Sequence, residues 1–179
     1  MLASIRTFEF ARGALVSVWI LLSLAIVAAP YLAVHSHPVA AAFLYLFFSP
    51  VCHQNPMRSF TFDGYPWAVC QRCAGIYIGA LILSLLPGLT SGMMSQPRMR
   101  RVLVFAASVP LLLDASLPVT GIWTNAPWSR FASGMIFGAM ISTLLLSGVP
   151  QFFSEAPWQR SPSGRPTLNG GISWTRKRC

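Results

Sequence analysis

Residues 52–79 read CHQNPMRSFTFDGYPWAVCQRCAGIYIG and contain three of the four cysteines of the chain and one of its three histidines. The charged residues within the stretch are Arg58, Asp63 and Arg72. An apolar run lies on each side, at residues 38–50 and 75–91. The sequence therefore predicts a small thiol-rich loop held between apolar helices.

The composition indicates a membrane protein. Of the 179 residues, 54% are hydrophobic and only 9% are charged, whereas about a quarter of the residues in a soluble domain are charged. The net charge is +9, but the basic residues lie in short clusters at the ends of apolar runs and form no stripe with interleaved aromatic residues. We therefore expect the lipid bilayer as the partner of this chain, and we exclude nucleic acid.

The apolar runs predict an all-α membrane protein with four transmembrane helices. A helix needs about 20 apolar residues to cross the hydrocarbon core of a bilayer. The runs assigned as crossings are 13–34, 75–91, 102–120 and 128–149. The run at 38–50 is too short to cross comfortably, so we interpret it as a re-entrant or half helix that presents an outward-facing Cys/His loop.

The positions of the basic residues predict the topology. Three arginines in residues 92–101 and five Lys or Arg residues in the segment 151–179 favour a cytoplasmic position for both segments. The predicted organisation is a cytoplasmic head at 1–12, a transmembrane domain at 13–150 and a disordered basic cytoplasmic tail at 151–179. The Cys/His loop at 52–73 would then be extracytoplasmic, in a multi-pass protein of the cell membrane.

The cysteines of the loop suggest three alternatives. Cys70 and Cys73 form a C-x-x-C at a helix start, and together with Cys52 and His53 they make a complete ligand set for zinc or another transition metal. The same pair could instead be redox-active, because a helix N-terminus and Arg72 would both stabilise a thiolate. The third alternative is a disulfide that only staples the loop.

Asp114 is the one carboxylate within a predicted crossing. An ionisable residue in such a position is a candidate for function, and the alternative is a structural ion pair with Arg130. The candidate catalytic residues are therefore Asp114, Arg130 and Arg72.

Two segments, CHQNPMRSF and VCQRCAGIYIG, carry a resemblance. The chain resembles a family of small prokaryotic membrane proteins known as domain of unknown function 2085, over residues 51–138. The residues that fit the later part of the family pattern are Pro110, Asp114, Asn125, Arg130, Gly134 and Gly138. The resemblance implies an architecture and candidate residues but no activity.

A weaker similarity, to DsbB-type thiol oxidases, implies quinone as an alternative cofactor. In that interpretation Cys70 and Cys73 are the redox pair, Cys52 is the resolving thiol and Arg72 polarises the quinone. The chain has no cysteine between Cys73 and Cys179, whereas those oxidases use a second pair. Three functions therefore stay open: a metal-binding membrane protein with zinc preferred, a quinone-linked thiol-disulfide oxidoreductase, and a structural or accessory membrane protein.

Overall fold

The computed structural model describes residues 2–86, 97–121 and 125–154, which contain five α-helices and one two-stranded sheet. The helices are α1 (Leu2–Val34), α2 (Pro38–Phe48), α3 (Gln71–Leu85), α5 (Pro97–Ser116) and α6 (Pro127–Ser154). The strands are β1 (Ser59–Phe62) and β2 (Tyr65–Cys70). Two short 3-10 helices, η1 (Pro56–Arg58) and η2 (Leu117–Thr120), precede β1 and follow α5.

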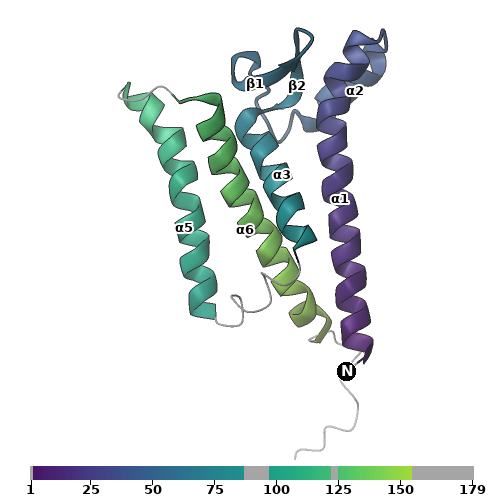
Figure 1. Ribbon diagram of the computed structural model, residues 1–179, viewed down its shortest axis with the longest axis vertical. Helices are drawn as coiled ribbons and strands as arrows, with labels where there is room; N and C mark the ends of the chain where they lie inside the picture. The colour runs from purple at the N-terminus through teal and green to yellow at the C-terminus, as the bar shows by residue number, and fades with distance from the viewer. Residues whose placement is uncertain (1, 87–96, 122–124, 155–179) are drawn as a thin grey trace, which may run out of the picture.

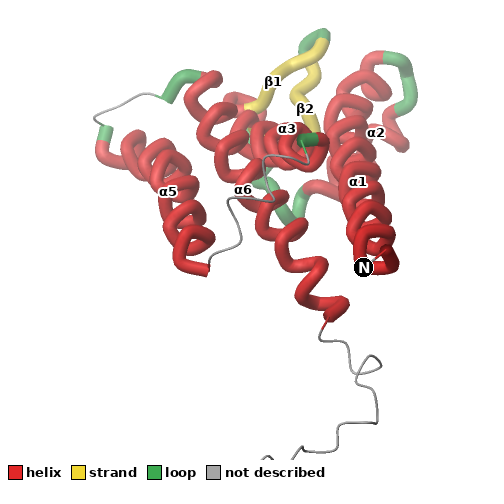
Figure 2. Tube along the Cα trace, turned by 60° about the horizontal axis from the view of Figure 1, so that its bottom comes forward, coloured by secondary structure: helices red, strands yellow, loops and turns green. Residues whose placement is uncertain are grey.

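The four longer helices lie side by side, and the β-hairpin caps one end of them (Figure 1). A second direction of view shows the same order, with α6 between α5 and α3 and with α1 beyond α3 (Figure 2). The helix α2 folds back beside α1. The end of α1, the start of α3, the end of α5 and the start of α6 therefore lie at the same end of the bundle as the hairpin.

A small core beneath the hairpin joins α1, α2 and β2. It contains Phe48 of α2 and Val69 of β2, both of which are fully buried. Burial of such a phenylalanine side chain contributes about 2 kcal/mol to the free energy of folding. Cys52 belongs to the same core and is 5% exposed, so the packing of these apolar side chains fixes one of the thiols.

Four glycines set the distance between α3 and α6, the most extensively packed pair of helices. They are Gly75, Gly79, Gly134 and Gly138. A β-carbon at any of these positions would overlap a backbone atom of the opposite helix. Small residues at this spacing allow two helix backbones to approach closely, so the N-terminal halves of α3 and α6 are held against each other.

The prediction of an all-α fold is wrong, because the segment expected to be an irregular loop contains an antiparallel hairpin. Phe62 pairs with Tyr65 across a two-residue turn in which Asp63 and Gly64 have φ values of 49° and 82°. Positive φ at both central residues is typical of a type I′ turn, for which Asp-Gly is a preferred sequence. The sequence signal for the hairpin was therefore present at the turn.

The prediction of four transmembrane helices is also wrong. Two helical segments, Glu9–Val34 and Pro127–Ser147, are long and apolar enough to cross a membrane within the described residues. The 15 residues of α3 span only about 22 Å at 1.5 Å per residue, which is less than the hydrocarbon thickness. The 20-residue α5 carries Arg98, Arg100 and Arg101 at its start and Asp114 near its end, which lowers its hydropathy.

Parts of the predicted organisation fall at the edges of what the structure describes. The segment predicted as a cytoplasmic head lies within α1 from residue 2 onward. The helix α6 continues to Ser154, and residues 155–179 of the predicted tail lie outside the described residues. The domain boundaries proposed from the sequence therefore stay predictions.

Candidate metal centre

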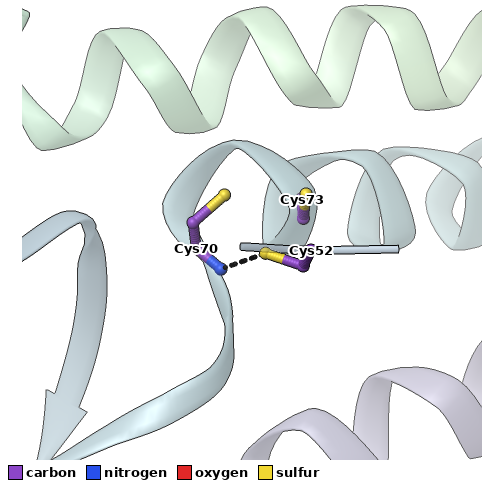
Figure 3. Close-up of side chains that lie close together, drawn as sticks. All are labelled: Cys52, Cys70 and Cys73. Carbon is purple, nitrogen blue, oxygen red and sulfur yellow. Dashed lines mark hydrogen bonds between the residues drawn. The ribbon is translucent and has the colours of Figure 1, made fainter. Parts of the chain in front are cut away.

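Three cysteines from two segments meet at the start of α3 (Figure 3). Cys52 follows α2, and its N–H donates to the carbonyl of Phe48 over 3.0 Å. Cys70 ends β2 opposite Ser59 and occupies the position just before α3, while Cys73 lies in the first turn of that helix. The three sulfur atoms lie within 4.8 Å of one another, and all three residues are free thiols. The cluster is therefore close enough to hold a metal ion.

The surroundings of Cys52 favour its thiolate. Its Sγ accepts hydrogen bonds from the backbone N–H groups of Cys70 at 3.2 Å and Gln54 at 3.5 Å. Hydrogen bonds from the thiols of Cys70 and Cys73, together with these backbone bonds, lower the pKa of Cys52 to about 2 in spite of its burial. The pKa of Cys73 is raised, first by the hydrogen bonds of Cys73 to Cys52 and Cys70 and then by burial. The thiolate is thus favoured at Cys52 and disfavoured at Cys73.

Gln54 holds the loop that carries Cys52. Its backbone has a left-handed φ of 48°, and its Nε2 donates to the carbonyls of Tyr45 at 2.6 Å and Ala68 at 2.8 Å. The hydroxyl of Tyr45 donates in turn to the carbonyl of Pro66. One amide side chain therefore ties the end of α2 to β2, which sets the distance between Cys52 and Cys70.

A second chain of hydrogen bonds runs from the loop to α6. The Ser59 hydroxyl donates to the carbonyl of Asn55 at 3.0 Å, and the Ser59 carbonyl accepts from Gln71 Nε2 at 3.4 Å. Gln71 Oε1 accepts from Arg130 Nη1, also at 3.4 Å. Gln71 is buried, so its amide connects the hairpin with the first turn of α6.

Asp114 joins α5 to the starts of α3 and α6. Its carboxylate accepts from Arg72 Nε at 3.1 Å, forms a second, shorter bond with Arg72 Nη2, and accepts from the Ser129 hydroxyl at 3.1 Å. Its backbone carbonyl accepts from Arg72 Nη2 and from Asn125 Nδ2. Pro118 stands four residues later and has no N–H to donate. Arg72 and Asn125 therefore satisfy a carbonyl that the helix itself leaves free.

The thiols border a cavity of about 440 Å³. Its other lining residues are Val51, His53, Asn55, Arg58, Arg72 and Arg130. The cluster thus opens onto a space with three guanidinium groups rather than being sealed in the core.

A family model described as "Predicted membrane protein (DUF2085)" matches residues 52–144. The chain belongs to this family. The matched range begins at Cys52 and includes the hairpin, α3, α5 and most of α6. All the hydrogen-bonded residues just described, apart from Tyr45 and Phe48, lie within it.

Two relatives of this DUF2085 protein come from archaea. An uncharacterized protein of Methanocaldococcus jannaschii is 31% identical over 119 residues, which cover 62% of this chain and 69% of the relative. An uncharacterized protein of Methanothermobacter thermautotrophicus is 29% identical over 97 residues, which cover 54% of this chain and 86% of the relative. No solved structure matches the chain.

Within this DUF2085 protein the predicted site residues fall into two groups. Cys52, Cys70 and Cys73 come together, whereas the metal cluster does not include His53, which is exposed and lines the same cavity. A role for His53 as a ligand therefore stays a prediction. The carboxylate of Asp114 pairs with Arg72 and not with Arg130, because the start of α3 reaches the end of α5.

Sequence reasoning missed the residues that hold the DUF2085 site together. Gln54 and Gln71 stand inside the quoted motifs, but only the cysteines and His53 of those motifs were predicted as ligands. Ser129, which donates to Asp114, gave no signal, because a serine in the first turn of a helix is ordinary. Both glutamines are uncharged polar residues close to a motif cysteine in an apolar chain. A buried polar side chain needs a hydrogen-bond partner, so this position was the signal that could have identified them.

Proposed function

We propose that this protein binds a metal ion, with zinc preferred, through Cys52, Cys70 and Cys73. The observation that carries the proposal is the approach of the three sulfur atoms to within 4.8 Å of one another. Sulfur ligands at about 2.3 Å from a tetrahedral zinc ion are about 3.8 Å apart. Movements of less than about 1 Å per side chain would therefore complete the geometry, which lies within the range of rotamer adjustment.

The chemistry of the ligands supports zinc. Three thiolates form a soft donor set, which favours zinc or monovalent copper over magnesium or calcium. The metal-binding form of cysteine is the thiolate, and the lowered pKa of Cys52 keeps it in that form at neutral pH. Four protein ligands, with His53 as the fourth, would make a structural site, and a water in the fourth position would make a site able to hydrolyse a bound substrate.

We further propose that the metal centre lies on the extracytoplasmic side. The two helical segments suited to crossing, Glu9–Val34 and Pro127–Ser147, have opposite directions relative to the hairpin (Figure 1). Both termini of the chain would then be on the face opposite the hairpin. Arg6 and Arg12 at one terminus and the basic segment 155–179 at the other favour a cytoplasmic position for that face.

The test is elemental analysis of the protein purified in detergent under reducing conditions. We expect about one equivalent of metal per chain in the parent and a loss of more than about 80% in Cys70→Ser, because two remaining thiolates form an incomplete site. Cys179→Ser removes the cysteine outside the cluster and is the matched control, which is expected to keep its metal. His53→Ala distinguishes the two forms of the site, since only a fourth protein ligand would lower metal retention during dialysis. A parent protein without metal would contradict the proposal.

One observation favours a second candidate, a quinone-linked thiol oxidoreductase. The Cys52 sulfur lies near both thiols of the C-x-x-C pair, as a resolving thiol requires. Oxidation of two thiols to a disulfide would release two protons and two electrons, and a quinone would accept them as quinol. A quinone needs an apolar site beside the thiols. The apolar hollow of about 690 Å³ between α1 and α2 has no cysteine in its lining, and for this reason we rank metal binding above quinone reduction. Reduction of an added quinone by the metal-free dithiol form, lost in Cys73→Ser, would establish the oxidoreductase.

A further inference from the structure

The cavity beside the cysteines holds more positive charge than its surroundings neutralise. Arg58, Arg72 and Arg130 all line it. Of these three arginines, only Arg72 has a carboxylate partner among the described residues, Asp114. Among the described residues, the Arg130 side chain has one hydrogen bond, to the neutral Gln71 over 3.4 Å, and the Arg58 side chain has none.

The composition explains why these charges stay unbalanced. The whole chain has four carboxylate side chains against thirteen Lys and Arg residues. Glu9 pairs with Arg12 and Asp114 pairs with Arg72. Asp63 is exposed in the turn of the hairpin, and Glu155 lies outside the described residues. A guanidinium group that loses water on burial has to be compensated, and Arg130 is half-buried.

The lining of the cavity supplies no carboxylate to compensate these groups. Asp114 reaches only Arg72 among the three arginines. The guanidinium groups of Arg58 and Arg130 therefore face the cavity without a carboxylate partner among the described residues, and positive charge is in excess there.

We propose that this cavity binds a phosphate group through Arg58 and Arg130. The planar guanidinium fork matches two oxygens of a phosphate, and such paired bonds are stronger than bonds between neutral groups. Arg130 stands in the first turn of α6, where the candidate crossing Pro127–Ser147 begins, which is the depth of lipid head groups in a membrane. A cavity of about 440 Å³ also has room for the organic part of a phosphate ester.

The proposal goes beyond metal binding, because Arg58 and Arg130 are not ligands of the thiol cluster. Lipid head groups and free phosphate compounds share the recognised chemistry, so two probes are needed. The probes are inorganic phosphate and dihexanoyl phosphatidic acid, each titrated calorimetrically into the full chain in a maltoside detergent that contains no phosphate. Binding of phosphatidic acid alone would identify a lipid as the source, and binding of inorganic phosphate would show that the phosphate group suffices.

Arg58→Gln and Arg130→Gln are each expected to weaken binding about tenfold or more, the usual effect of losing hydrogen bonds to a charged group. Arg101→Gln is the matched control, because Arg101 is exposed near the start of α5, at the end of the bundle opposite the hairpin (Figure 1). It is expected to bind within about twofold of the parent, since a screened surface charge contributes little at that distance. If Arg130→Gln fails to fold, Arg58→Gln alone decides the question, because Arg58 is exposed.

Absence of binding to both probes would overturn the proposal, as would an equal loss in Arg101→Gln. Treatment of the parent protein with a chelator under reducing conditions separates this inference from the proposed function. The treated protein is expected to bind phosphate within about threefold of the untreated protein, because the guanidinium forks supply the binding energy. Loss of phosphate binding after this treatment would refute the claim that the arginines suffice, whatever the metal content of the parent.

Discussion

Asp114 is the residue on which three helices depend. Its carboxylate contacts Arg72 of α3 and Ser129 of α6, and its carbonyl contacts Arg72 and Asn125. The Asp114 side chain is 8% exposed and that of Arg72 is 27% exposed. Ion pairs at this depth add little stability over an apolar pair, but removal of one partner leaves a charge without compensation.

We therefore expect Asp114→Ala to lower the free energy of unfolding by about 3 kcal/mol, because Arg72 loses its counterion. Unfolding by denaturant in detergent, followed by circular dichroism, measures this change. The double variant Arg72→Met/Asp114→Leu removes both charges and is the control, expected to regain most of the loss. Additive losses from the two positions would contradict a coupled pair.

At the scale of elements, the contact of α3 with α6 depends on the absence of side chains. Gly138 faces the backbone of Ile76 so closely that a β-carbon would overlap it. Helix propensity alone predicts that Gly→Ala stabilises a helix by about 1 kcal/mol. The close contact between the two backbones predicts that Gly→Ala at this position instead destabilises the protein.

Gly138→Ala is expected to reduce stability by about 2 kcal/mol or more, because the rigid backbone opposite has to move. Gly13→Ala is the matched control, since Gly13 lies in α1 with nothing within 4 Å of an added β-carbon, and that variant should be neutral or more stable. Thermal unfolding of both variants in the same detergent decides between the two effects. An unchanged midpoint for Gly138→Ala would refute the close approach.

The same elements show what the sequence could predict. The cluster of Cys70, Cys73 and Cys52 agrees with the predicted grouping. Cys70 and Cys73 are close in sequence at the start of α3, whereas the hairpin brings Cys52 to them. The hairpin was missed although Asp63-Gly64 predicts its turn. The sequence analysis named Arg130 as the ion-pair partner of Asp114, whereas the structure pairs Asp114 with Arg72, because the partner depends on how α3 and α5 are rotated. The count of crossings was too high because apolar content does not distinguish a crossing from a short packed helix.

At the scale of the whole molecule, the arrangement of α1 and α6 predicts opposite accessibility for the hairpin and the C-terminal segment. We expect Asp63→Cys, at the exposed hairpin turn, to react with a membrane-impermeant maleimide on intact cells. The native Cys179 serves as the internal control and should react only after lysis, because basic segments stay in the cytoplasm. Mass spectrometry of the labelled peptides assigns each site. Labelling of Cys179 alone on intact cells would show the inverse orientation.

The glycine contact between α3 and α6 also bears on how the protein is made. The ribosome completes α3 and the cysteine loop before α5, and α6 emerges only afterwards. We expect α3, which is too short to cross a bilayer alone, to wait at the insertion machinery with its glycine face bare until α6 arrives. During that interval the cysteine loop has been synthesised, but α6 does not yet pack beside it. Biogenesis therefore depends on the last helix, and a chain truncated before α6 should be a substrate for quality-control proteolysis.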